Sequence, residues 1–230
     1  SKGNLSFSGS GETDFGTASF FTFTSDAQGA VTSHAISLDM GDMGTVAFDQ
    51  GTGGYGIGTI DDKTPSAYEE VWNGTNATNS DIMDGSGGAA GVFGYKNTFM
   101  DFDVSFEYAP AVGSGDAGDG ATSYNASIID GSSVNFAITN SSMVDGMSFG
   151  VGYGETDWDL LSTDVANIDS TQSTTAFVTY AMGPVTVGAQ NTYTSGSVSA
   201  TNSHIGANEV TVWGVAFNVN DALSVSYHDY

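Results

Sequence analysis

Apolar and polar residues alternate over many short stretches of this chain. The clearest stretch covers residues 102–108. Its apolar positions are Phe102, Val104, Phe106 and Tyr108, and its polar positions are Asp103, Ser105 and Glu107. Because successive side chains of a strand point to opposite faces, this pattern predicts a strand with one apolar and one polar face.

The same alternation recurs along the whole chain, and it predicts an all-β protein. Clear strands are expected at 134–139, 147–154, 185–193 and 222–230. Weaker ones are expected near 4–11, 18–26, 33–40, 45–51, 90–98, 174–182 and 209–219, which gives about twelve strands in all. Each is long enough to cross a bilayer obliquely.

The predicted connections alternate between short and long. The long ones are 27–32, 52–89, 111–131, 156–172 and 195–208. An antiparallel up-and-down meander with short turns at one end and long loops at the other is typical of a transmembrane β-barrel. A soluble β-sandwich does not require this asymmetry.

Charge narrows the function classes. The 230 residues contain 3 Lys plus Arg against 27 Asp plus Glu, a formal net charge of −24. This balance argues against nucleic acid as a partner, because phosphate binding needs a cationic surface. No Cys occurs, so disulfides, thiol nucleophiles and Cys-ligated zinc are excluded. The polar strand faces hold Gly, Ser, Thr, Asn and acids rather than Lys, which suits a water-filled lumen.

The segment 52–89 is too long for a simple connection in a compact domain. The residues before it are Ile36-Ser-Leu-Asp-Met-Gly-Asp-Met-Gly-Thr-Val-Ala-Phe-Asp-Gln-Gly51. Within the segment, Pro65 at the start of 65–72 favours about two helical turns there.

The segment 34–51, through its residues Ile36 to Gly51, together with this long segment resembles the general-diffusion porins of Gram-negative outer membranes, most closely the alphaproteobacterial type. The resemblance implies a barrel of about sixteen strands that assembles as a homotrimer. It implies that 52–89 is the third loop, which folds into the barrel and constricts the pore. Fewer strands precede and follow the loop than the family has, so residues 1–230 are expected to form one barrel domain that is incomplete at both ends.

A pore needs polar, rigid walls and no catalytic groups, so charged residues are the candidate site. The constricting segment offers Asp61, Asp62, Glu69, Glu70, Asp81, Asp84 and Lys63. The strand alternation offers Asp39, Asp49, Asp103 and Glu107 for the lumen wall. Acids raise the local cation concentration and repel anions, which predicts cation selectivity. The resemblance also implies Arg and Lys on the wall that faces the third loop. This chain departs from that pattern, because it has no Arg and its Lys are Lys2, Lys63 and Lys96.

The sequence supports a calcium site or an enzyme active site less well than a pore. Asp116 and Asp119 lie in a Gly-rich stretch and are candidates for calcium, which prefers several oxygen ligands. Gly146–Gly150 matches a nucleophile-elbow pattern, but its alternation continues as a strand. Gly113–Gly118 matches a dinucleotide fingerprint but opens no helix. We therefore expect no catalytic residues, no enzyme activity and no cofactor other than a possible Ca²⁺.

The predicted function is a porin of the bacterial outer membrane that lets ions and small hydrophilic solutes diffuse passively. Its other partners are membrane lipid and two further copies of the chain. Aromatic residues on the apolar faces form membrane girdles in this interpretation and a core in a soluble protein. They are Tyr108, Tyr153, Tyr180, Tyr193, Trp213, Phe217 and Tyr227. The alternative function is a secreted acidic adhesin or surface-layer protein, a β-sandwich or β-solenoid with calcium-stabilised loops.

Overall fold

One antiparallel sheet accounts for almost all of the regular structure. The computed structural model describes residues 5–25, 30–49, 54–67, 91–112, 129–159, 170–195, 197–198, 204–205 and 207–229. Within these residues, 12 strands pair in the order β1-β2-β3-β4-β5-β6-β7-β8-β9-β10-β13-β14. Each strand therefore lies beside the strand that precedes it in this meander, and β1 and β14 are the open edges.

The strands agree closely with the alternation in the sequence. Their bounds are β1 Leu5–Thr13, β2 Gly16–Ser25, β3 Ala30–Asp39, β4 Thr45–Asp49, β5 Val92–Phe99, β6 Phe102–Val112, β7 Ile129–Asn140, β8 Met147–Asp159, β9 Ser170–Met182, β10 Val185–Thr194, β13 Asn208–Asn220 and β14 Leu223–Asp229. Two 3-10 helices, η1 (Gly41–Met43) and η2 (Gly56–Ile60), and a small pair, β11 (Ser197–Val198) and β12 (His204–Ile205), complete the described elements.

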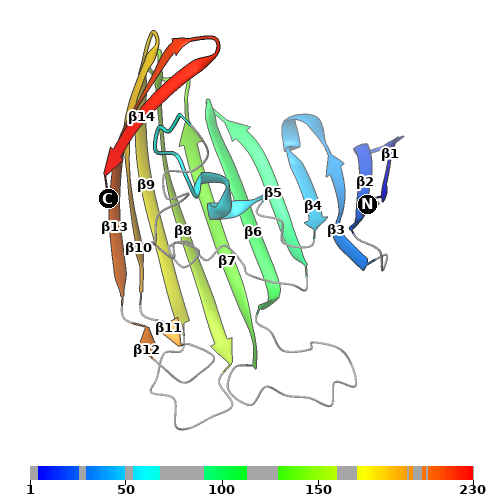
Figure 1. Ribbon diagram of the computed structural model, residues 1–230. Helices are drawn as coiled ribbons and strands as arrows, with labels where there is room; N and C mark the ends of the chain where they lie inside the picture. The colour runs from blue at the N-terminus through cyan, green and yellow to red at the C-terminus, as the bar shows by residue number, and fades with distance from the viewer. Residues whose placement is uncertain are drawn as a thin grey trace.

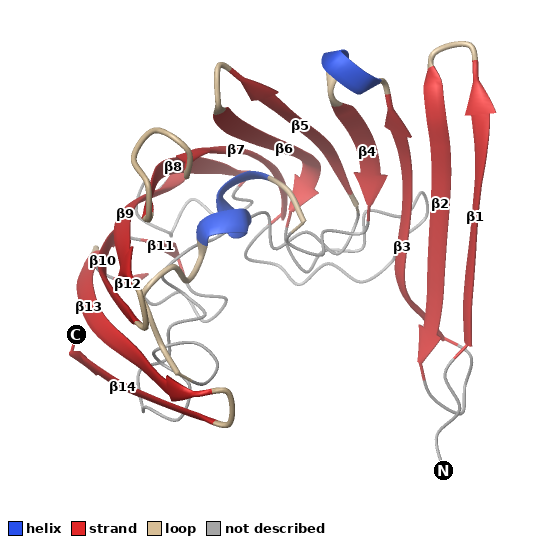
Figure 2. Cartoon of the chain, turned by 90° about the horizontal axis from the view of Figure 1, so that it is seen from above, coloured by secondary structure: helices blue, strands red, loops and turns tan. Residues whose placement is uncertain are grey.

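The sheet curves strongly, so that it has a convex and a concave side. Figure 1 shows the strands side by side, and Figure 2 shows that they form an open arc around η2. The concave side, which carries residues 54–67, is called the inner face below. A single meander confirms the all-β, up-and-down fold class, and the β-sandwich and β-solenoid alternatives are wrong for the described residues.

Two local expectations differ from the structure. Of the stretch 65–72 that was expected to be helical, residues 65–67 are not helical and residues 68–72 lie outside the described residues, whereas the earlier residues 56–60 form η2. A 3-10 helix of five residues is too short to show an apolar periodicity, and its geometry depends on the wall behind it. The pair β11 and β12 was also missed, because each strand has only two residues. Among the described helices, none is long and apolar enough to cross a membrane.

The polarity of the two faces is the reverse of that in a water-soluble protein. On β9 the buried positions are Thr171, Ser173, Thr175 and Phe177, and the exposed positions on the opposite face include Ala176, Val178 and Tyr180. Elsewhere, the exposed outer residues include Phe93, Phe106, Val134, Val151, Trp213 and Val225. Buried inner residues elsewhere include Ser105, Ser133, Asn135, Gln190 and Thr192. This arrangement satisfies the hydrophobic effect only if an apolar medium covers the outer face.

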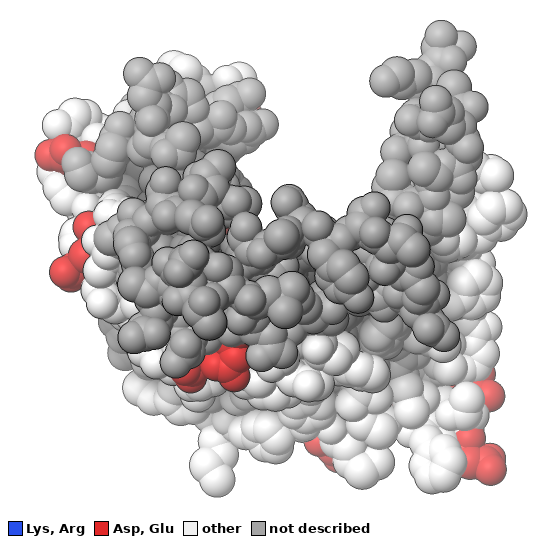
Figure 3. Space-filling view, turned by 90° about the horizontal axis from the view of Figure 1, so that it is seen from below, with Lys and Arg blue, Asp and Glu red and all other residues white. Residues whose placement is uncertain are grey.

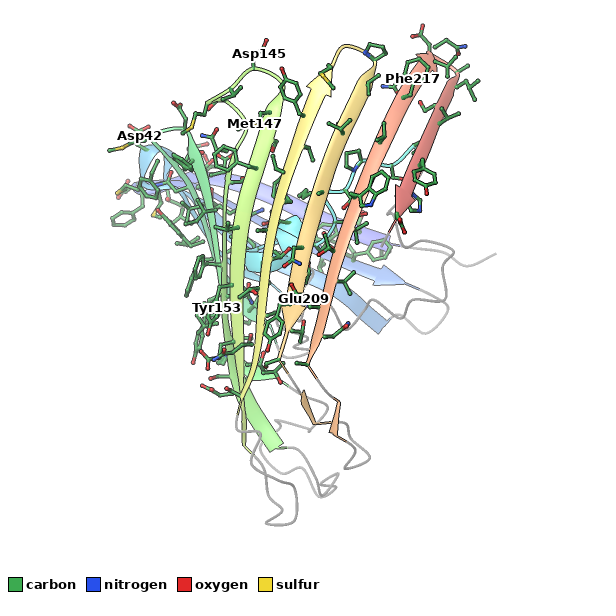
Figure 4. All side chains as sticks on the ribbon, turned by 90° about the vertical axis from the view of Figure 1, so that its left-hand side faces the viewer. Asp42, Asp145, Met147, Tyr153, Glu209 and Phe217 are labelled. Carbon is green, nitrogen blue, oxygen red and sulfur yellow. The ribbon has the colours of Figure 1, made fainter. Side chains whose placement is uncertain are left out.

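The predicted girdle aromatics lie on this outer face and do not form a core. Tyr180, Val187, Val215 and Tyr227 are successive partners across four strands. Tyr153 and Tyr193 lie nearer the long connections, and Tyr153 packs on Phe136 with ring centroids 6.1 Å apart. Figure 4 shows Phe217 near the short-turn end and Tyr153 and Glu209 toward the other end. The aromatic side chains are thus spread toward both ends of the outer surface.

The short turns are tight, and the β5–β6 turn is strained. Met100 (φ 49°) and Asp101 (φ 68°) both lie in the left-handed region, which non-glycine residues avoid. They link Phe99 to Phe102 directly, so the turn has the two-residue form that favours Asn-Gly. The Met100 side chain is 95% exposed and contributes little packing.

We therefore expect the double substitution Met100→Asn with Asp101→Gly to stabilise the protein by about 1 kcal/mol, because it relieves left-handed strain. Urea unfolding of the detergent-solubilised protein measures the change. Met143→Asn is the matched control, since Met143 is an exposed turn methionine without a positive φ. A gain that is equal in the control would contradict the strain argument.

Candidate functional site

Residues 54–67 lie across the inner face, and side chains of the wall hold them there. The Gly56 N–H donates to Ser105 Oγ at 2.8 Å, and the Ile57 N–H donates to Asn135 Oδ1 at 2.8 Å. These are N–H groups of the first turn of η2, which have no acceptor within the helix itself. The wall therefore supplies the cap that η2 lacks in its own sequence.

Asn135 is the centre of this attachment. Its side chain is fully buried, and its Nδ2 donates to Glu107 Oε1 at 3.0 Å. The neighbouring strands β6 and β7 place Glu107 and Asn135 directly opposite each other. A carboxylate that accepts from an amide fixes the direction of that amide, so that Asn135 Oδ1 points at η2.

Gln190 on β10 holds the following part of the segment by both ends of its amide. Its Oε1 accepts from the Lys63 N–H at 2.8 Å, and its Nε2 donates to the Ile60 carbonyl at 2.8 Å. The same Nε2 donates to Thr175 Oγ1 at 2.9 Å. Only 3% of Gln190 is exposed, so leaving either amide end without a partner would carry a full desolvation cost.

Glycines in the wall make room for the segment. A Cβ at Gly152 would lie 2.8 Å from Ile57 Cγ1, and one at Gly188 would lie 2.8 Å from Pro65 Cδ. A Cβ at Gly214 would meet the Pro65 carbonyl at 2.7 Å, and one at Gly94 would overlap the Tyr55 ring. Since these contacts are shorter than side chains tolerate, the groove exists because four strands have no side chain there.

A small apolar cluster completes the attachment. Ile60 packs with Ala137 of β7 and Phe177 of β9, and Ile57 beside it is fully buried. These contacts bury apolar surface between the segment and the wall. Each buried Ile contributes on the order of 2 kcal/mol.

The predicted site residues separate into three groups. In the segment, Asp61 is exposed, while Asp62 and Lys63 are half-buried. Of the wall acids, Asp39 and Asp103 lie on the inner face and are exposed, and each accepts a local hydrogen bond, from the Gly41 N–H and the Thr98 hydroxyl respectively. The residues outside the described part of the chain are Glu69, Glu70, Asp81, Asp84, Asp116 and Asp119.

The other two predicted wall acids, Glu107 and Asp49, are not exposed wall charges among the described side chains. Glu107 is only 2% exposed, so it lies behind η2 as a support for Asn135 and not as an open wall charge. Alternation assigned it to the inner face but could not show that the segment covers it. Asp49 pairs with Ala35 and Val92 in the sheet, and its side chain is outside the described set.

Sequence reasoning missed the neutral residues that carry the attachment. Ser105, Asn135 and Gln190 all stood on predicted polar faces, opposite apolar positions, but only charged residues were singled out. Asn and Gln are unusual in the middle of a strand, and this was the available signal. No group of three or more potential metal-ligating side chains gathers among the described residues.

Comparison with known proteins agrees with this geometry. No protein-family model matches the chain, and no curated protein matches its sequence. A porin structure refined at 1.8 Å resolution matches 98% of this chain and 74% of its own length, with 15% identity and a TM-score of 0.58. The chain has a porin fold. A loop-deletion mutant of OmpT, an outer membrane protein of Vibrio cholerae, matches 99% of the chain with 15% identity and a TM-score of 0.44.

The position of residues 54–67 on the polar inner face determines which chemical groups this face can present. The inner wall carries hydroxyls, amides and carboxylates, and residues 54–67 cover part of it. In Figure 3, which shows the molecule from below, the described Asp and Glu lie at several places along the margin of the face seen. Such an arrangement can select solutes by size and charge without any covalent step.

The attachment of Lys63 gives a direct prediction. Gln190→Leu removes the acceptor of the Lys63 N–H, so the segment should detach locally and tryptic cleavage after Lys63 should become faster. The chain has only 3 Lys plus Arg, so this cut is easily identified by mass spectrometry. Thr64→Val is the matched control, because the buried Thr64 hydroxyl has no hydrogen-bond partner among the described residues. Equal protection of Lys63 in Gln190→Leu and in the unaltered protein would refute the attachment.

The glycine groove gives a second prediction. Gly152→Val places a side chain against Ile57 and Ile60, and overpacking of this kind costs about 2 kcal/mol. Urea unfolding should show this loss, and cleavage after Lys63 should rise with it. Gly11→Val is the control, because a Cβ at Gly11 meets no atom within 4 Å. Destabilisation of both variants by the same amount would show that strand propensity, and not the groove, is responsible.

Proposed function

We propose that this protein is an outer-membrane porin through which ions and small hydrophilic solutes diffuse passively. The observation that carries the proposal is the reversed polarity of the sheet, with apolar side chains outside and polar side chains inside. Lipid would contact the outer face, and hydrated solutes would pass along the inner face. No cofactor and no covalent step belong to this function, so enzyme activity is not part of it.

The proposal includes a closed pore and an assembly. A sheet in lipid cannot keep open edges, so β1 and β14 would be joined through further strands, toward about sixteen in total. Association of three such barrels is the expected assembly. The resemblance of residues 36–51 to alphaproteobacterial porins supports a general-diffusion type, with the loop that contains 54–67 as the constriction.

Charge supports a preference for cations. The formal net charge of −24 and the exposed inner-face acids Asp39 and Asp103 raise the local concentration of cations in the pore. Asp61 on the segment adds to the same field. Glu107 contributes less to this field in our proposal, because η2 covers it.

The test is single-channel recording of the full-length protein in a planar bilayer under a KCl gradient. We expect stepwise openings and a reversal potential that favours K⁺ over Cl⁻. Asp103→Asn combined with Asp39→Asn should move the reversal potential toward zero, whereas Asp145→Asn, an exposed acid in the β7–β8 turn, should move it less. Folded protein that never opens a channel would refute the porin assignment, and Cl⁻ preference would refute the cation selectivity alone.

A further inference from the structure

Two of the very few basic residues line one cavity on the inner face. The chain has 3 Lys plus Arg, and both Lys63 and Lys96 border a cavity of about 600 Å³. Lys63 approaches it from the segment and Lys96 from β5. Because the chain has a net charge of −24, two lysines at one cavity make this cavity unlike the rest of the protein in charge.

Neither ammonium group is neutralised by a carboxylate within the described part of the chain. Lys96 Nζ lies 4.8 Å from the centroid of the Tyr55 ring, a cation–π contact that holds the side chain without removing its charge. Lys63 is bound to the wall through its backbone N–H, which leaves its side chain out of that contact. Asp103 in the cavity lining accepts the Thr98 hydroxyl at 2.6 Å and keeps its negative charge, so the described lining holds two lysines against one acid.

The other residues that line the cavity indicate which chemical groups of a ligand would fit there. Hydroxyl-bearing residues from several strands and turns line the same cavity as the two lysines, among them Thr45, Thr98, Thr139, Ser141 and Ser148. Ile60, Ala137 and Phe177 form an apolar border on the side of the segment. Hydroxyls exchange hydrogen bonds with hydroxyls, ammonium groups bind carboxylates, and an apolar border accommodates C–H surfaces.

We propose that this cavity is a binding subsite for small hydroxylated organic anions, such as sugar acids, on the solute path of the pore. The inference rests on the proposed porin function and names a solute class for it. A volume of about 600 Å³ is within the usual range for small-molecule sites. The solute's carboxylate would lie between Lys63 and Lys96, and its hydroxyls would face the Ser and Thr side chains.

Such a subsite has a clear role in an acidic pore. The exposed acids of the inner face repel anions, so anionic nutrients would pass more slowly than neutral ones of the same size. A local site with two ammonium groups offsets this repulsion at the constriction. Transport requires that binding is weak enough for release, which is why two partly solvated lysines suit the purpose better than a closed site.

The test uses single-channel recording of the full-length protein, with sodium gluconate as the anionic probe and glucose as the neutral control. We expect gluconate to interrupt the current at lower concentrations than glucose does. In the double variant Lys63→Gln with Lys96→Gln, the apparent Kd for gluconate should rise by at least about tenfold, the loss expected when charged hydrogen bonds disappear. The glucose response should stay unchanged.

The single variants separate binding from structure. Lys63→Gln should leave the segment attached, because Gln190 binds the Lys63 backbone, and it should still weaken gluconate binding. Lys96→Arg keeps the charge over Tyr55 and should retain binding. Equal responses to gluconate and glucose in the unaltered pore, or an unchanged gluconate response in the double variant, would overturn the inference.

A second measurement separates this inference from the porin proposal. If folded protein opens no channels, the porin proposal fails, and calorimetric titration of gluconate into the detergent-solubilised protein then decides on the subsite. Heat of binding that disappears in the double variant would support an anion site in a protein of other function. No heat of binding in the unaltered protein would overturn the site.

Discussion

The alternation of strand side chains between two different environments is the constraint on which this structure depends. Each strand presents every second residue to the same side, so one sheet can be apolar on its outer face and polar on its inner face. Phe93, Phe106 and Trp213 are exposed, while Asn135 and Gln190 are buried. A sheet of this kind is stable only between an apolar medium and a hydrated or polar interior, which limits where the protein can work.

The polar side chains of the inner face bind the segment 54–67. Asn135 and Gln190 give the segment acceptors and donors that it cannot provide for itself, and Glu107 fixes the orientation of Asn135. Glycines at 152, 188 and 214 bring the segment close to the wall. In the proposed pore, a constriction held at several points would keep its shape while solutes pass, which a freely moving loop would not do.

Charged side chains are distributed unevenly around the segment 54–67. Asp39, Asp61 and Asp103 are exposed, whereas Glu107 is enclosed behind η2 and serves the attachment. Lys63 and Lys96 border a cavity whose other polar groups are mostly hydroxyls. The same short segment carries the exposed Asp61 and the cavity-lining Lys63, and in the proposed pore it would also narrow the path.

The sequence by itself determined the strands and their faces, because side-chain alternation is a local property that each strand of at least five residues records in its own residues. It placed Asp103, Asn135 and Gln190 on the polar side for the same reason. Only the tertiary structure decided that Asn135 and Gln190 grip the segment, that Glu107 is covered, and that Lys63 and Lys96 share a cavity. These contacts join residues far apart in the chain. They depend on the curvature of the sheet and on the space that glycines leave for the segment, and neither can be read from the residues near Asn135, Gln190 or Lys63 in the sequence.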